Sequence, residues 1–274
     1  MTEPAIRVHF IESGSRRIFV LMRQPRTAQG RAVLIAAPFA EEMNKSRRML
    51  TLVGRELAAR GLAVVLPDLT GTGDSDGEFG DADWESWSAD LKAAADWSAA
   101  EGWPVAALLG VRTGCLLGAQ AARELSAPLT TSVFWQPVTD GERFLTQFLR
   151  LRIAATAMAG GNESTTQLRA RLSAGETLEV AGYELSPRLA GQLAGLRLVR
   201  ELSGALGALH WLELARSATA SLPEASQACI RAAQQAGLSV ACRTVPGEPF
   251  WSTTEIVEIP ELVTLTADAL GTQS

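Results

Sequence analysis

Cysteine and histidine are both scarce in this chain of 274 residues. The three cysteines, Cys115, Cys229 and Cys242, are too few and too scattered for a disulfide framework or a tetrahedral thiolate site. The two histidines, His9 and His210, leave equally little material for a metal centre. We therefore expect a protein of a reducing compartment that uses no metal and no other cofactor.

An excess of charge of one sign and a long apolar run are also missing. The chain has 25 Lys and Arg against 30 Asp and Glu, with no basic block, so a dedicated nucleic-acid binder is not expected. No run reaches about 18 apolar residues, so we expect no membrane span. The charged segment 1–10 has no apolar centre and predicts no secretion signal. With 47% hydrophobic residues, the sequence favours a folded cytoplasmic protein.

Short apolar runs alternate with helical stretches along most of the chain. This alternation predicts βαβ crossovers and an α/β fold with a mostly parallel sheet and helices on both faces. The predicted strands are 6–11 and 17–22, which form a hairpin, and 32–37, 63–67, 105–109, 131–135, 208–214 and 238–245. The predicted helices are 46–60, 84–101, 113–125, 223–236 and 259–270.

Residues 138–204 interrupt this alternation. The segment is rich in Leu, Ala and Arg and shows helical periodicity, for example at Phe144, Phe148 and Leu151. We predict an inserted helical cap at 138–204 within a single core formed by 1–137 and 205–274. The cap arginines Arg150, Arg152, Arg169 and Arg171 are either a basic rim for an acidic carrier protein or ordinary helix surface.

A strand, a sharp turn and a helix are predicted to meet at residues 109–115. Gly110 and Gly114 have the spacing of the G-x-S-x-G nucleophile elbow of the α/β-hydrolase fold, but the apex is Arg112. Residues 67–75, which read PDLTGTGDS, resemble the D-x-x-G-x-G-x-S turn that follows the preceding strand of that fold. The order and spacing of the two motifs predict the α/β-hydrolase fold.

Four further stretches indicate a family. They are 38–48 (PFAEEMNKSRR), 144–152 (FLTQFLRLR), 180–187 (VAGYELSP) and 247–251 (GEPFW). Together they resemble exosortase A system-associated hydrolase 2, over nearly the whole chain. The resemblance implies the α/β-hydrolase fold, a hydrolase label, and association with the exosortase/PEP-CTERM and exopolysaccharide gene clusters of Gram-negative bacteria. It implies no substrate.

The positions that a serine hydrolase uses for catalysis hold other residues. Acyl transfer on this fold needs a nucleophile, a histidine base and a carboxylate that orients the histidine. Arg112 stands at the nucleophile position and cannot attack a carbonyl. Thr219 lies in a loop, 214–223, that has no carboxylate, and Phe250 stands where the histidine is expected. The sequence therefore predicts a pseudoenzyme without the Ser-His-Asp triad.

Other residues are candidates to replace the missing catalytic groups, and each also has a structural interpretation. Cys115 is either a relocated nucleophile or a small buried thiol that packs the helix on the sheet. Ser46 and Ser75 are either nucleophiles or turn and N-cap residues. Glu41 and Glu42 are either an acid/base pair or a solvated loop that pairs with an arginine.

Arg112 requires a counter-charge if its side chain points inward, because a buried cation near the start of a helix is costly. We expect Glu41, Glu42 or Glu213 to supply it, or the carboxylate or phosphate of a ligand. The alternative is an arginine that turns outward into solvent. The candidate ligand-binding residues are Arg112, Phe39, Glu41, Glu42, Thr113, Glu213 and Trp251.

Two functions follow from these residues. The first is a non-catalytic protein that binds an anionic or acyl ligand, or a partner such as a paralogous hydrolase or a carrier protein. The second is an active hydrolase of an ester or thioester that uses a non-standard set of catalytic residues.

Overall fold

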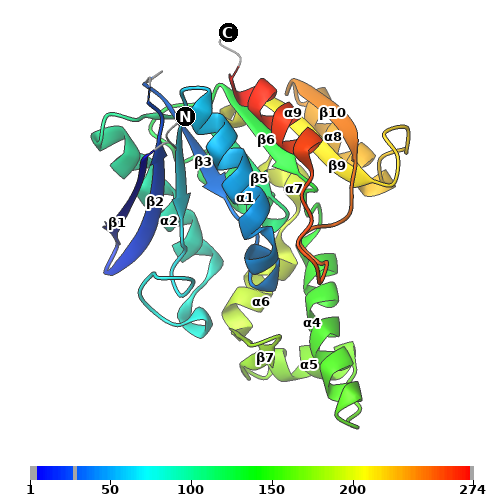
Figure 1. Ribbon diagram of the computed structural model, residues 1–274. Coiled ribbons are helices and arrows are strands. Elements are labelled where there is room, and N and C mark those ends of the chain that lie inside the picture. The colour runs from blue at the N-terminus through cyan, green and yellow to red at the C-terminus, as the bar shows by residue number, and fades with distance from the viewer. Residues whose placement is uncertain (1–4, 27–29, 272–274) are drawn as a thin grey trace.

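An eight-stranded sheet forms the centre of the protein in a computed structural model that describes residues 5–26 and 30–271 (Figure 1). The strand order is β1-β2-β4-β3-β5-β6-β9-β10. β2 pairs antiparallel with both β1 and β4, and every other pair of neighbours is parallel. The strands are β1 (Ala5–Ser13), β2 (Arg16–Gln24), β3 (Ala32–Ala36), β4 (Ala63–Pro67), β5 (Val105–Val111), β6 (Thr131–Trp135), β9 (Ala208–Ala215) and β10 (Val240–Pro246). The predicted α/β class is confirmed.

Helices cover both faces of the sheet, because the central strands are apolar on both sides. α1 (Glu41–Ala59) and α9 (Pro260–Gly271) lie together on one face, in front of the sheet in Figure 1. α2 (Trp84–Ala100), α3 (Thr113–Ala121) and α8 (Glu224–Gln235) pack on the other. Two short 3-10 turns, at Phe79–Asp81 and Gly204–Leu206, complete this part of the chain.

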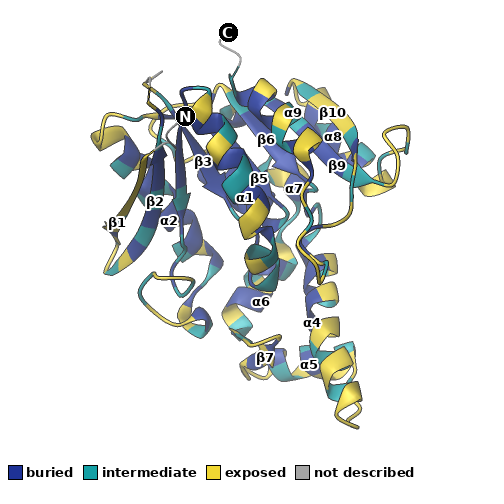
Figure 2. Cartoon of the chain, in the orientation of Figure 1, coloured by how far each residue is buried: buried dark blue, intermediate teal, exposed yellow. Residues whose placement is uncertain are grey.

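The burial of α1 illustrates how its sequence forms an element of the core. Met49, Leu50, Val53 and Leu57 recur at helical spacing and are all buried against the sheet and α9. Figure 2 shows buried residues on the central strands and exposed residues on the outer faces of the helices, while the edge strands β1 and β10 are largely exposed.

Residues 138–204, hereafter the cap segment, connect β6 to β9. They form α4 (Gly141–Met158), α5 (Thr165–Ser173), β7 (Leu178–Val180), β8 (Tyr183–Leu185), α6 (Pro187–Gly195) and α7 (Leu198–Glu201). In Figure 1 most of this segment projects below the sheet, beyond the carboxyl ends of the parallel strands. The antiparallel pair β7–β8 was not expected in a helical segment. Its strands have three residues each, too few to show a period-2 pattern.

Two helix boundaries differ from the prediction. α1 begins at Glu41, five residues before the predicted start, because Ala40 makes the turn with a φ of 53° and two acidic residues occupy the first turn. α3 ends at Ala121 because the amides of Arg123 and Glu124 bond carbonyls three residues back, which tightens the chain out of the helix.

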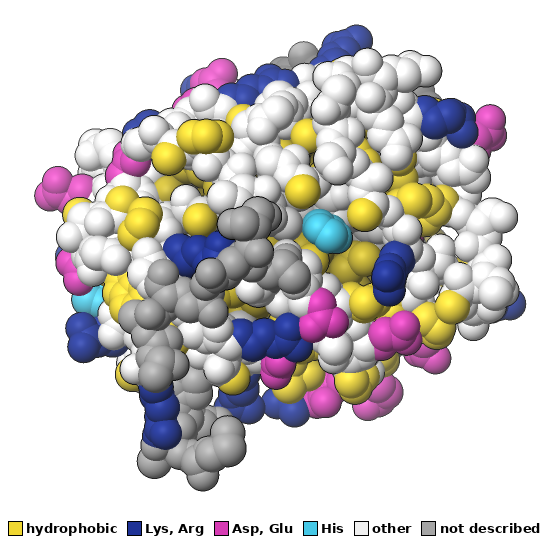
Figure 3. All heavy atoms as spheres, turned by 90° about the horizontal axis from the view of Figure 1, so that it is seen from above, with side chains coloured by type: hydrophobic (Ala, Val, Ile, Leu, Met, Phe, Trp, Pro, Cys, Tyr) yellow, Lys and Arg dark blue, Asp and Glu magenta, His cyan; other side chains and the backbone are white. Residues whose placement is uncertain are grey.

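The surface agrees with the modest net charge. On the face farthest from the cap segment, acidic and basic side chains are interspersed among apolar ones (Figure 3). None of the helices in residues 5–26 and 30–271 combines the length and apolarity that crossing a bilayer requires.

Candidate functional site

The elbow between β5 and α3 has the predicted geometry. Its apex, Arg112, has φ 56° and ψ −116°, a strained conformation for a residue with a side chain. A Cβ atom on Gly114 would lie 2.0 Å from the carbonyl oxygen of Ala36, and one on Gly110 would lie 2.9 Å from the Cα of Cys115. Gly114 is therefore required for the elbow to pack against β3, and Gly110 is required for the tight turn into α3.

Strained backbone conformations occur just after three adjacent parallel strands. Ala40 follows β3, Arg112 follows β5 and Gln136 follows β6, with φ values of 53°, 56° and 44°. Among the described residues other than glycine, only Ala181 also has a positive φ. Such conformations cost about 1–3 kcal/mol each and persist where the surroundings impose them, often at binding or catalytic sites. The carboxyl edge of β3, β5 and β6 is thus the candidate site.

The guanidinium of Arg112 points inward and is neutralised by Glu42. Its Nη2 lies 3.0 Å from Glu42 Oε1, and its Nε donates to the same carboxylate at 3.2 Å. Its Nη1 donates to the carbonyl oxygen of Gln136 at 3.2 Å, and the guanidinium carbon lies 4.8 Å from the centre of the Trp251 ring. The side chains of Arg112 and Glu42 are 14% and 20% exposed. An internal carboxylate therefore supplies the counter-charge that the sequence required, and the outward orientation is wrong.

Burial works against the charge on Glu42. Removal from water raises the pKa of its carboxyl above the usual range, and the nearby Arg112 partly opposes this rise. Glu41, one residue earlier, points elsewhere, since it lies 4.0 Å from Lys45 and accepts a hydrogen bond from Asn44. Only one member of the predicted pair thus contacts Arg112.

Glu213 is buried at the end of β9 but is held by neighbours other than Arg112. Its carboxylate accepts hydrogen bonds from Trp211 Nε1 at 2.8 Å and from Gln136 Nε2 at 3.5 Å. Gln136 also accepts from the amide of Leu214 at 2.8 Å, so one side chain ties β6 to β9. Gln136 was not predicted as a site residue. Its place directly after a predicted strand was a usable signal, because ligands bind at strand carboxyl ends in such sheets.

The remaining positions of the expected triad have structural contacts. Phe250 is buried, with its ring centre 6.0 Å from that of Trp135, in an edge-on arrangement. Thr219 lies in an exposed turn, where its hydroxyl is 2.8 Å from that of Ser217. Phe250 thus fills core volume where an imidazole was considered.

The two histidines are placed away from the elbow. His9 lies on β1 against Trp97, with ring centres 4.8 Å apart. His210 is level with Leu109 across the sheet, three residues before the apex and therefore roughly 10 Å from it along the strand direction. Burial and the nearby Arg243 lower the pKa of His210. The side-chain partners of Arg112 are Glu42, Gln136 and Trp251, and neither histidine is among them.

The candidate replacement nucleophiles are engaged or buried. Cys115 is fully buried, and burial raises the pKa of its thiol well above the usual range, so little thiolate forms. Ser46 Oγ donates to the carbonyl of Glu42 at 2.6 Å, and Ser75 Oγ donates to the carbonyl of Asp68 at 2.6 Å. These contacts favour the structural alternatives for all three.

Phe39 and Thr113 stand where this fold forms its oxyanion hole, from one amide after β3 and one after the apex. The amide of Phe39 donates to the hydroxyl of Thr113 at 3.1 Å. That hydroxyl therefore already occupies the place of an oxyanion at one of the two donors. The Phe39 ring lies on the cap side, with Phe148 4.9 Å away.

Three cavities surround the elbow. The largest, about 560 Å³, has Arg112, Glu213 and Arg143 in its wall and is called the polar pocket here. A second, about 190 Å³, is called the aromatic pocket, and its wall is formed by Phe39, Glu41, Glu42, Lys45, Phe144, Gln147, Phe148, Leu151, Trp251 and Ser252. A third, about 150 Å³, lies on the side of Trp84, Trp87 and Tyr183. No group of three or more metal-binding side chains occurs in the parts of the chain that the structure describes.

The cap arginines are mostly paired within the cap segment. Arg152 and Arg171 bind the carboxylate of Glu163 at 2.8 and 2.7 Å, and Arg169 binds Glu142 at 2.8 Å. These contacts favour helix surface over a basic rim, since three of the four cations already have carboxylate partners.

The comparisons with known proteins agree with this architecture. A sequence profile of the X-Pro dipeptidyl-peptidase (S15) family matches residues 18–142, which contain the elbow. The ferulic acid-bound Est1E from Butyrivibrio proteoclasticus has a TM-score of 0.66 at 16% identity, with 96% of each chain covered. The chain has the α/β-hydrolase fold.

Two further solved structures extend that result. A putative hydrolase from Agrobacterium vitis S4 has a TM-score of 0.65 at 17% identity, covering 98% of this chain and all of the other. An esterase from Pyrococcus furiosus has a TM-score of 0.63 at 14% identity, covering 97% of this chain and 90% of the other. No curated protein matches the sequence. At these identities the similarity establishes the fold alone.

Proposed function

We propose that this α/β-hydrolase-fold protein is a non-catalytic binding protein that holds an anionic ligand, a carboxylate by preference, at Arg112. The observation that supports this most is the ion pair at the elbow apex. Arg112, whose guanidinium stays protonated, occupies the position where the fold places its nucleophile, and the carboxylate of Glu42 is paired with it.

The site supplies several interactions that a carboxylate ligand requires. The Nε and Nη2 atoms of Arg112 present two donors on one edge of the guanidinium, which matches two carboxylate oxygens. Glu42 now occupies that edge, and Arg112 also lines the polar pocket, whose volume of about 560 Å³ is within the range of small-molecule sites. The Trp251 ring holds the guanidinium in place from one side.

The resemblance of the sequence to exosortase A system-associated hydrolase 2 supports a role for this binding function in the cytoplasm, in an exosortase/PEP-CTERM and exopolysaccharide system. A paralogous hydrolase or a carrier protein that delivers an acyl group is a compatible partner. The pairing of Arg152, Arg169 and Arg171 within the cap segment makes a small ligand the better-supported choice.

The alternative is a hydrolase of an ester or thioester with a non-standard catalytic set. Its support is the fold shared with esterases such as that of Pyrococcus furiosus and the match to a peptidase family. The contacts of Cys115, Ser46 and Ser75 weigh against it, because each of these side chains donates to a backbone carbonyl rather than to a side-chain base.

Calorimetric titration with hexanoate tests the proposal, with hexanol as the neutral probe of equal chain length. We expect wild-type protein to bind hexanoate and not hexanol, and Arg112→Met to bind it roughly 10- to 100-fold more weakly, the worth of a charged hydrogen-bonded contact. Arg150→Met, on the exposed surface of α4, is the matched control and should bind like wild type.

Arg112→Met leaves the buried Glu42 unpaired, so Arg112→Met/Glu42→Gln is titrated beside it, and both are checked for cooperative unfolding. Equal hexanoate affinity in wild type and in a folded variant without Arg112 would overturn the proposal. Absence of hexanoate, benzoate and phosphate binding by wild type would do the same.

A further inference from the structure

The Arg112–Glu42 ion pair lies between the polar pocket and the aromatic pocket. Glu42 lines the aromatic pocket, Arg112 lines the polar pocket, and Phe144 and Gln147 line both. The ion pair therefore stands at the boundary between the two cavities. A carboxylate placed on Arg112 where the Glu42 carboxylate now lies has the aromatic pocket directly behind it.

The walls of that pocket are suited to an apolar group. The Phe39 ring lies edge-on to Phe144 and Phe148, with centres 5.6 and 4.9 Å away, and the rings of Phe144 and Phe148 are stacked on consecutive turns of α4. Leu151, on the next turn, is 47% exposed at the rim. At roughly 30 Å³ for each group of the size of a water molecule, about 190 Å³ holds about six such groups.

On the proposed function of Arg112, we infer that the ligand is a carboxylate with an apolar tail of about six heavy atoms, and that Glu42 is its internal stand-in. The ligand carboxylate displaces Glu42 from Arg112, and its tail enters the aromatic pocket.

Glu42 is suited to leave when a ligand arrives. Its charged form is disfavoured by burial, whereas on release it gains water and the neighbourhood of Lys45, one turn further along α1. Arg112 keeps its bond to the Gln136 carbonyl and its stacking on Trp251 throughout, so the anion exchange leaves the guanidinium in place. Besides Arg112, the ligand would meet one cation, Lys45, among the residues that line the aromatic pocket. This favours a monoanionic carboxylate over a phosphate dianion.

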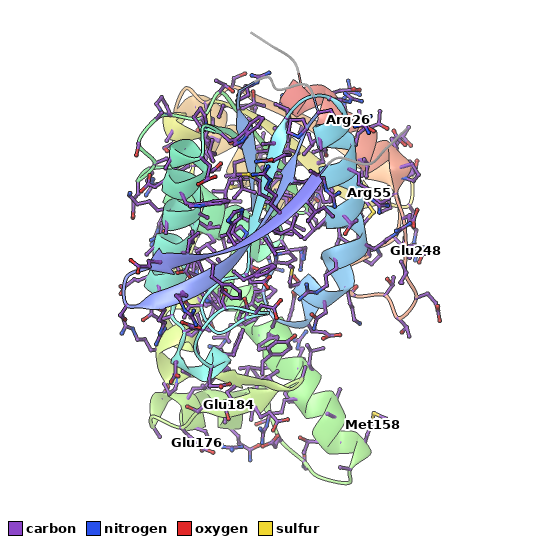
Figure 4. All side chains as sticks on the ribbon, turned by 60° about the vertical axis from the view of Figure 1, so that its left-hand side comes forward. Arg26, Arg55, Met158, Glu176, Glu184 and Glu248 are labelled. Carbon is purple, nitrogen blue, oxygen red and sulfur yellow. The ribbon has the colours of Figure 1, made fainter. Side chains whose placement is uncertain are left out.

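A chain-length series tests the tail. Calorimetry with butanoate, hexanoate, octanoate and decanoate should show wild-type affinity rising about fourfold per added methylene, the worth of burying one CH₂, until the pocket is full near octanoate. Leu151→Asp should flatten this dependence. Its matched control, Met158→Asp, changes an exposed side chain near the outer end of α4 and should keep the wild-type dependence (Figure 4).

A second pair of variants tests the stand-in. Glu42→Gln removes the competing charge and should tighten octanoate binding roughly tenfold. Glu56→Gln changes an acid on the same helix that pairs with Arg60 and lines none of the three cavities, so it should leave the affinity unchanged. Equal tightening in both variants would overturn the exchange.

The outcomes separate this inference from the proposed function. If wild type binds all four carboxylates with one affinity that depends on Arg112, the tail site is wrong and the proposed function stands. If affinity rises with chain length but does not depend on Arg112, both are wrong.

Discussion

Arg112 combines a strained backbone conformation with a charged side chain that is largely shielded from water. Its φ of 56° is the conformation that this fold uses to present a nucleophile, and its side chain is held by Glu42, Gln136 and Trp251. The strained turn fits because Gly114 allows close packing against β3 and Gly110 allows the close approach of Cys115. The turn has thus kept its geometry with a different chemical group at its apex.

Much at this scale was predictable. The spacing of the glycines located the elbow. The cost of an unpaired cation predicted that Glu41, Glu42, Glu213 or a ligand anion would neutralise an inward Arg112, and in the structure Glu42 does so. The sequence could not show which acid contacts Arg112. The answer depends on α1 beginning at Glu41, which directs Glu42 rather than Glu41 toward the apex.

The elbow glycine gives a prediction with a matched control. Gly114→Ala should destabilise the protein by about 3 kcal/mol or more, because its Cβ would lie 2.0 Å from a backbone carbonyl that cannot easily move. Gly191→Ala should instead stabilise by about 0.5–1 kcal/mol, since that glycine lies within α6 with nothing near the added atom. Urea unfolding measures both. A Gly114→Ala variant as stable as wild type would contradict the close packing.

At the scale of elements, the cap segment is held together by charge as well as by apolar contacts. Glu163 binds Arg152 and Arg171, and it also accepts a hydrogen bond from Thr156 at 2.9 Å. These contacts, with that of Arg152 first, lower the pKa of Glu163 from 4.5 to about 2. A carboxylate with a lowered folded-state pKa stabilises the fold above its unfolded value and loses that contribution as pH falls toward its folded value.

The lowered pKa of Glu163 predicts how stability depends on pH. Glu163→Gln should lower the melting temperature by about 2 °C at pH 7, a modest effect because the network is at the surface, and the difference from wild type should shrink as pH falls from about 4.5 towards 2. Glu248→Gln, an exposed acid in the loop after β10, is the control (Figure 4). A difference that stays constant across this range would show that the ion pairs contribute nothing.

Elements with strong periodicity were predictable, and short or locally capped ones were not. The hairpin and the central strands match their apolar runs closely. The β7–β8 pair escaped because a three-residue strand has no period to detect. The early start of α1 escaped because the turn at Ala40 uses a positive φ that its residue type does not suggest.

At the scale of the whole molecule, the alternation of strands and helices predicted the α/β class, and the motifs at 67–75 and 109–115 predicted the α/β-hydrolase fold. The fold comparisons agree. The way the cap segment closes over the strand ends was not predictable, because it depends on long-range packing of Phe39 against Phe144 and Phe148. That packing creates the aromatic pocket, so the sequence indicated an anion at Arg112 but gave no account of what lies behind it.

The most direct measurement is turnover of p-nitrophenyl butanoate and of a butanoyl thioester by the protein at pH 7. A binding protein with a guanidinium at the apex predicts hydrolysis no faster than buffer alone, while hexanoate still binds to the same preparation. Turnover above buffer that disappears in Cys115→Ala or in Glu42→Gln would contradict the account and show that this elbow catalyses acyl transfer.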